Sequence, residues 1–180
     1  DAMRALINSV NRANHLAKLT GEKSTVMPGH FMFLGNPGTG KTTVARMMGK
    51  ILHSMGVIQR PDVIEVDKSK LVGRYVGETE AITTEVINSA MGGILFVDEA
   101  YSLAGDQYGR NALDTLLKQL EDKRDRFVCI VAGYTKQMEE FIDSNPGLKS
   151  RFNTVIEFDD YTGEELQMIF DGLCFGSHFL

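Results

Sequence analysis

The eight residues Gly35–Thr42, GNPGTGKT, constrain the fold of this chain more than any other stretch. They match the pattern G-x-x-x-x-G-K-T, in which glycines let the backbone turn tightly and point its N–H groups at phosphate oxygens. The apolar residues 30–34 precede them and indicate a buried strand. Behind them apolar residues recur at helical spacing, namely Val44, Met48, Ile51 and Met55. A strand, a glycine-rich loop and a helix start in this order predict a phosphate-binding loop (P-loop).

The positions of this motif have expected roles toward a nucleotide. Lys41 is expected to reach the β- and γ-phosphates, and the Thr42 hydroxyl is expected to hold Mg²⁺. The whole loop would surround the phosphates, so the predicted nucleotide-binding residues are Asn36, Pro37, Gly38, Thr39, Gly40, Lys41, Thr42 and Thr43. A glycine- and proline-rich turn with a chance lysine is the alternative, and the flanking strand and helix argue against it.

A second motif ends another predicted strand. The apolar residues 94–97 are followed by Asp98 and Glu99, the pattern of a Walker B strand. Transfer of a phosphoryl group to water needs a metal to offset charge and a group to orient the water. We therefore expect Asp98 to act on Mg²⁺ through its water shell and Glu99 to polarise the attacking water. The alternative is an acidic pair that only caps the strand.

Strands alternate with helices along the chain. The predicted strands are 30–34, 63–66, 94–97, 127–132 and 154–158. Helical patterns lie at 2–19, after the P-loop, at 82–90, at 113–120, around 138–141 and from Thr162, where Thr162 and Glu165 form a capping box. Loops or turns are expected at 71–79, 101–109 and 144–147, and the charged run 121–125 is interpreted as solvating a helix end. This alternation predicts an α/β fold with a parallel sheet covered on both faces, whose polar clusters gather at one edge.

Composition narrows the class of protein. The 180 residues are 43% hydrophobic and 24% charged, which is typical of a globular domain. The formal charge of −5 does not favour general nucleic-acid binding, and no apolar run approaches the roughly 20 residues of a membrane span. Cys129 lies inside a predicted strand and is expected to be a buried free thiol. Without a disulfide framework, a reducing and therefore cytoplasmic location is expected.

Four segments together resemble the CbxX/CfxQ branch of the AAA+ ATPases, which includes red-type Rubisco activase and the stage V sporulation protein K group. They are residues 35–46, 71–77, 93–101 and 144–152, and the resemblance extends over about residues 25 to 170. It implies a P-loop NTPase core of three α/β/α layers, the AAA+ large subdomain, at 25–161. The implied parallel sheet has five strands in the order 5-1-4-3-2. An N-terminal helix and linker at 1–24 would precede this core, and 162–180 would begin a helical lid too short to supply a sensor-2 residue.

The resemblance also implies an activity and an assembly. Members of this branch hydrolyse ATP with Mg²⁺ and remodel protein substrates as rings, usually hexamers. Arg151 matches the arginine finger that completes a neighbouring subunit's site, where a planar guanidinium suits the charge developing on the γ-phosphate. Lys149 is a weaker candidate, and a surface arginine is the alternative. Tyr75, between Gly73 and Gly77, matches the pore-loop aromatic that grips a polypeptide, although it could instead be packed under its loop.

The sensor-1 position follows the fourth predicted strand. Many AAA+ proteins carry asparagine there, whereas this chain has Tyr134 and Thr135. Both are predicted nucleotide-binding residues, and which of them senses the γ-phosphate stays open.

Two other functions stay open at this point. The incomplete lid and the unusual sensor are compatible with a nucleotide-dependent scaffold or switch without sustained turnover. A small-molecule P-loop kinase would need an acceptor pocket, and Glu99 beside Asp98 points to water as the nucleophile instead. The expected partners are other subunits of a homo- or hetero-oligomeric ring and a protein substrate, with no membrane and no nucleic acid.

Overall fold

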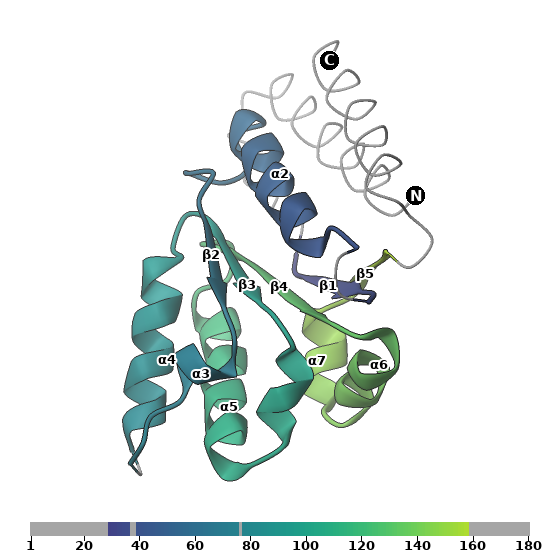
Figure 1. Ribbon diagram of the computed structural model, residues 1–180. Coiled ribbons are helices and arrows are strands. Elements are labelled where there is room, and N and C mark those ends of the chain that lie inside the picture. The colour runs from purple at the N-terminus through teal and green to yellow at the C-terminus, as the bar shows by residue number, and fades with distance from the viewer. Residues whose placement is uncertain (1–28, 37–38, 76, 159–180) are drawn as a thin grey trace.

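Five parallel strands form one sheet in the computed structural model, which describes residues 29–36, 39–75 and 77–158 (Figure 1). The strands are β1 (Phe31–Leu34), β2 (Val63–Val66), β3 (Ile94–Val97), β4 (Val128–Gly133) and β5 (Thr154–Glu157). Their order across the sheet is β2-β3-β4-β1-β5, and neighbouring strands pair in parallel. Read from the other edge, this is the predicted order 5-1-4-3-2, which is therefore confirmed.

Helices connect the strands. They are α2 (Lys41–Ser54), α3 (Lys68–Leu71), α4 (Glu78–Ser89), the 3₁₀ helix η1 (Ala100–Ala104), α5 (Gln107–Asp122), α6 (Thr135–Asp143) and α7 (Pro146–Arg151). The predicted helices at 2–19 and from Thr162 lie outside the described residues. Within the ranges that the structure describes, no helix combines the length and apolarity needed to cross a bilayer.

Helix α7 occupies a segment whose start was predicted as a turn. The side chain of Asn145 accepts a hydrogen bond from the backbone N–H of Gly147 at 2.9 Å, and Pro146 follows as the first helical residue. Asparagine before a helix and proline in its first turn are both favourable, so the residues typical of a turn here begin a helix. This difference matters because Arg151 is the last residue of that helix.

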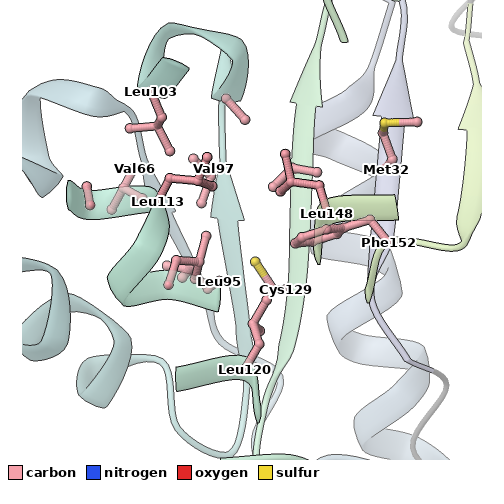
Figure 2. Close-up of a cluster of buried hydrophobic side chains, with 14 of the residues drawn as sticks. Met32, Val66, Leu95, Val97, Leu103, Leu113, Leu120, Cys129, Leu148 and Phe152 are labelled. Atoms are coloured by element: carbon pink, nitrogen blue, oxygen red, sulfur yellow. The ribbon is translucent and has the colours of Figure 1, made fainter. Parts of the chain in front are cut away.

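Successive side chains of each strand point to opposite faces of the sheet, and both faces are covered by buried hydrophobic clusters. In β1, Phe31 and Phe33 pack with α2, whereas Met32 and Leu34 belong to the cluster on the opposite face. That second cluster, drawn in Figure 2, joins the sheet to α5 and α7. Figure 1 shows α2 on one face of the sheet and α4 to α7 on the other. Cys129 is fully buried as a free thiol, as predicted, and this burial raises its pKa above the usual range.

The register of the sheet decides which residues can meet. Leu34 at the end of β1 lies beside Gly133 at the end of β4, and the N–H of Gly35 donates to the Gly133 carbonyl at 3.1 Å. The N–H of Asp98 donates to the carbonyl of Val66, the last residue of β2, at 2.8 Å. The polar residues that follow these strands therefore gather at the carboxyl edge, as expected.

His30, just before β1, is a mostly buried histidine at the opposite, amino edge. Its Nδ1 accepts a hydrogen bond from the backbone N–H of Cys129 at 3.0 Å. Its ring centroid lies 6.1 Å from that of Phe127 and 5.9 Å from that of Phe152. Burial lowers the pKa of His30 to about 4, and the charge of Asp125 only partly opposes this. The imidazole is therefore neutral near pH 7.

The free energy of unfolding should depend on this histidine at mildly acidic pH. The ordinary pKa of a histidine is 6.5, against about 4 for His30 in the folded chain, so unfolding takes up a proton at pH values between these two. Stability present at pH 7 is thus lost as the pH falls, by about 2 kcal/mol at pH 5. We expect His30→Gln, which keeps an acceptor for the Cys129 N–H, to flatten this dependence in urea unfolding at pH 7.5 and pH 5.

The carboxyl groups of Asp67 and Asp106, whose pKa values are also shifted by the fold, do not interfere with that experiment. Hydrogen bonds lower the pKa values of Asp67 and Asp106 below their ordinary value of 3.8, so both carboxylates stay ionised at pH 5. Equal losses of stability in the wild type and in His30→Gln between the two pH values would contradict the account of His30.

Candidate active site

A cleft of about 420 Å³ opens at the carboxyl edge of the sheet. It is lined by Gly40, Lys41, Thr42, Thr43, Asp98, Glu99, Gly133 and Tyr134. Its volume is within the range of small-molecule sites. The structure thus brings the end of the P-loop, the acidic pair after β3 and the end of β4 together in one place. Pro37 and Gly38, also predicted to bind nucleotide, lie outside the described residues.

The P-loop enters α2 through a backbone conformation that favours glycine. Gly40, the residue before the helix, has φ 91° and ψ 15°, in the left-handed region. The Thr39 hydroxyl donates to the Asn36 carbonyl at 2.7 Å and braces the preceding turn. The N–H groups and dipole of the first turn of α2 therefore present partial positive charge at the cleft.

Lys41 keeps its ammonium group at the cleft. Its Nζ donates to the Gly35 carbonyl at 2.5 Å and lies 5.8 Å from the centroid of the Tyr134 ring. A cation within about 6 Å of an aromatic face is attracted by that ring. Lys41 and the N-terminus of α2 thus make one end of the cleft electropositive, which suits a polyphosphate.

Glu99, which also lines the cleft, adopts a strained backbone conformation. Its φ of 48° and ψ of 46° are left-handed, which costs a residue other than glycine about 1–3 kcal/mol. Its carbonyl accepts hydrogen bonds from the Ser102 N–H at 3.0 Å and the Ser102 hydroxyl at 2.7 Å. Asp98 Oδ1 accepts from the Glu99 N–H at 2.9 Å. These bonds hold the sharp turn that lets both carboxylates line the cleft.

Tyr134 and Tyr101 form an aromatic pair beside the acidic residues. Their ring centroids are 6.2 Å apart, and Tyr101 belongs to η1. Burial and the charge of Glu99 raise the pKa of Tyr101, so its hydroxyl stays protonated. Tyr101 was not among the predicted site residues, because it lies in a segment that was expected to be a loop. Thr135 begins α6 and is not among the residues that line the cleft.

The oxygen donors of the cleft fit a magnesium site. The Thr42 hydroxyl and the carboxylates of Asp98 and Glu99 are hard ligands of the kind Mg²⁺ prefers. The described part of the chain contains no group of three or more His, Cys, Asp or Glu residues able to hold a metal by themselves. The Thr42 hydroxyl and the two carboxylates match the way Mg²⁺ is held in nucleotide sites, by one or two carboxylates together with substrate phosphates.

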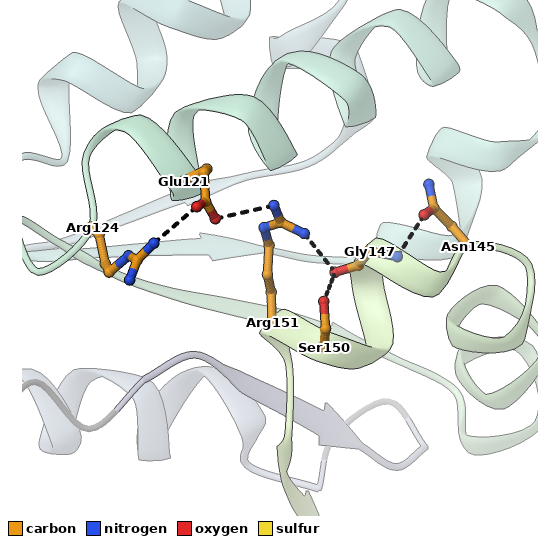
Figure 3. A network of polar contacts seen from close by, with 6 residues as sticks. All are labelled: Glu121, Arg124, Asn145, Gly147, Ser150 and Arg151. Atoms are coloured by element: carbon orange, nitrogen blue, oxygen red, sulfur yellow. Dashed lines mark hydrogen bonds and ion pairs between the residues drawn. The ribbon is translucent and has the colours of Figure 1, made fainter.

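Arg151 lies away from this cleft. Residue Phe31 at the start of β1 pairs with Thr154 at the start of β5, and Arg151 precedes Thr154. The arginine is therefore at the amino edge of the sheet, whereas the P-loop follows the carboxyl end of β1. Its side chain is 27% exposed and lies between α7 and the end of α5, as Figure 3 shows. Lys149 is exposed on the same helix.

Tyr75 lies on an exposed loop between α3 and α4. Tyr75 is 70% exposed to solvent. The alternative that this side chain is packed under its own loop is therefore excluded. The first turn of α4 anchors this loop, because Glu78 Oε2 accepts from the N–H groups of Arg74 at 3.1 Å and Tyr75 at 3.4 Å. The Thr79 hydroxyl also accepts from the Gly73 N–H at 3.1 Å.

Known proteins resemble this chain in sequence and in fold. The family described as "ATPase family associated with various cellular activities (AAA)" matches residues 31–160. Stage V sporulation protein K of Bacillus subtilis is 50% identical over 143 residues, which are 78% of this chain and 44% of that protein. Protein CbbX of Cereibacter sphaeroides is 46% identical over 161 residues, which are 87% of this chain and 51% of that protein. These relatives confirm the resemblance to the CbxX/CfxQ group.

A solved structure agrees on the fold alone. A RuvB protein of Thermotoga maritima superposes with a TM-score of 0.54 at 24% identity, covering 92% of this chain and 48% of that one. The chain thus spans about half the length of the curated relatives it matches.

Proposed function

We propose that this chain, which belongs to the AAA family of ATPases, binds ATP with Mg²⁺ in the cleft at the carboxyl edge and hydrolyses it with water. The observation that carries the proposal is the convergence of Lys41, Thr42, Asp98 and Glu99 on one cleft. These residues come from separate segments, and each matches one requirement of phosphoryl transfer to water.

Each residue of the cleft has a separate proposed role, which follows from the chemistry of its side chain. The N-terminus of α2 and the Lys41 ammonium group bind the phosphates, because both present positive charge to the cleft. Thr42 and Asp98 would hold Mg²⁺, which supplies charge compensation at the β- and γ-phosphate oxygens. Glu99 orients the attacking water and accepts its hydrogen bond. Tyr134 packs beside the bound phosphates.

The active site is completed by a second subunit. AAA proteins generally form rings, and in this chain the cleft and Arg151 lie at opposite edges of one sheet. A contact that places Arg151 of one copy at the cleft of the next copy therefore joins two different surfaces. Such heterologous contacts close into rings when the rotation permits. We propose a hexameric ring in which Arg151 acts in trans on the γ-phosphate.

The work done by hydrolysis is proposed to be remodelling of a protein substrate. Tyr75 supports this part of the proposal, because a large aromatic side chain that is 70% exposed can grip a polypeptide by packing. The hydrogen bonds from Glu78 and Thr79 couple its loop to the start of α4. Motion of α4 during the ATP cycle would thereby move Tyr75.

The test is phosphate release by the full-length protein with ATP, Mg²⁺ and no other acceptor. We expect steady turnover that falls at least about 10-fold when EDTA removes the metal, since Mg²⁺ offsets transition-state charge. ATP retained without phosphate release would instead favour a nucleotide-dependent switch. ADP formation that requires an added small-molecule acceptor, with the phosphoryl group transferred to that acceptor and no phosphate released, would favour a kinase.

A further inference from the structure

The guanidinium of Arg151 is held at two of its five N–H positions. Nη2 donates to Glu121 Oε2 at 3.2 Å, and Nη1 donates to the Gly147 carbonyl at 3.2 Å (Figure 3). Nε is buried and has no hydrogen-bond partner among the residues that the structure describes. Since each terminal nitrogen carries two protons, one N–H on each is left over for an acceptor outside this network. N–H groups on both terminal nitrogens of a guanidinium can donate to the oxygens of a phosphate.

The ion pairs of Arg151 form a trio with Glu121 and Arg124. Glu121 is shared, because its Oε1 also pairs with Arg124 Nη2 at 2.8 Å. Two guanidinium groups and one carboxylate leave a net positive charge in this cluster. Glu121 thus holds Arg151 without cancelling the charge that an anion would meet.

Holding the side chain in place has a clear physical use. A free arginine has about 2 kcal/mol of rotamer entropy to lose when it meets a ligand. Here a carbonyl from α7 and a carboxylate from α5 fix the guanidinium, and only 27% of the side chain is exposed. An exposed ion pair stabilises a fold by only about 0–1 kcal/mol. Positioning, rather than stability, is therefore the larger effect available to Glu121.

From this geometry we infer that Glu121 is a positioning residue for Arg151 and aims its two remaining N–H groups at the γ-phosphate bound by a neighbouring subunit. The inference rests on the proposed function of Arg151 in trans. Glu121 itself does not touch the nucleotide.

The test compares Glu121→Ala with Asp122→Ala in the full-length protein. Asp122 is exposed at the same end of α5 and, among the described residues, has no ion pair with Arg151. We expect Glu121→Ala to lower kcat about 10- to 100-fold, because a misplaced catalytic group costs that much. The Kd for ATP, the unfolding temperature and the ring size should stay near wild type. Asp122→Ala should stay within about twofold of the wild-type kcat.

Two further variants separate positioning from a general structural effect. Glu121→Gln keeps an acceptor oxygen for Nη2 and should give a kcat between those of the wild type and Glu121→Ala. In an Arg151→Ala background, Glu121→Ala should change the rate by less than about twofold, since residues that act as a unit are not additive. Radiolabelled ATP makes such slow rates measurable.

The rates of these variants distinguish a failure of the positioning role of Glu121 from a failure of the proposed role of Arg151 in trans. A wild-type or higher kcat in Glu121→Ala would overturn the positioning role, and so would an equal loss in both backgrounds. If Arg151→Ala itself turns over at the wild-type rate, the role of Arg151 in trans fails, and the inference about Glu121 falls with it.

Discussion

Replacing Glu99 by glutamine is expected to lower the rate of ATP hydrolysis at least about 100-fold, the usual contribution of a group that handles the attacking water's proton. Glutamine has the same shape but no negative charge, so it cannot polarise the water. The variant should still bind ATP, because Lys41 and the N-terminus of α2 are untouched. Phosphate release measures the first effect, and equilibrium binding of labelled ATP measures the second.

The choice of glutamine also controls for backbone strain. Glu99 has a left-handed backbone, and glutamine experiences the same steric cost there, so the comparison isolates the carboxylate. Glu85→Gln is a matched control, because Glu85 is exposed on α4 and does not line the cleft. Equal rates of hydrolysis in the wild type and in Glu99→Gln would contradict the assigned role.

Replacing Arg151 by alanine should lower turnover about 1,000-fold or more, the range measured for arginine fingers. The Kd for ATP should change little, because Arg151 lies at the amino edge, away from the cleft of its own chain. Stability should fall by roughly 1–2 kcal/mol, because alanine removes both the partly exposed ion pair with Glu121 and the hydrogen bond to the Gly147 carbonyl. Steady-state phosphate release and ATP binding are the two measurements.

Lys149→Ala provides the control for that experiment. Lys149 is exposed on the same short helix and is the other cation offered as a finger. Its loss should leave turnover within about threefold of wild type, as for most surface substitutions. A wild-type rate in Arg151→Ala combined with a large loss in Lys149→Ala would transfer the finger role to Lys149.

Features that depend on neighbours in the sequence could be predicted. The strands begin and end within one residue of the predicted ranges, because buried parallel strands are short apolar runs. The P-loop and the pair Asp98–Glu99 were also recognisable from the sequence, because the residues of each motif are adjacent in the chain. The strand order was a consequence of the family resemblance, and the pattern of strands and helices alone does not contain it.

Features that depend on distant contacts could not be predicted. Glu121 belongs to a charged run that indicated only a solvated helix end, and nothing in the sequence pairs it with Arg151. The left-handed turn at Glu99 needs Ser102, and the pairing of Tyr101 with Tyr134 needs η1 to pack beside the end of β4. Each arises from tertiary packing, which local patterns do not encode.

A ring whose sites are shared between subunits can be tested by mixing two inactive variants. Glu99→Gln keeps Arg151 but lacks the carboxylate, whereas Arg151→Ala keeps a complete cleft but lacks the finger. In an equimolar mixture, some clefts of the second variant meet Arg151 of the first. Random assembly through a head-to-tail contact should then restore up to about a quarter of the wild-type rate of phosphate release. A mixture that forms mixed rings yet stays as inactive as its components would contradict the account.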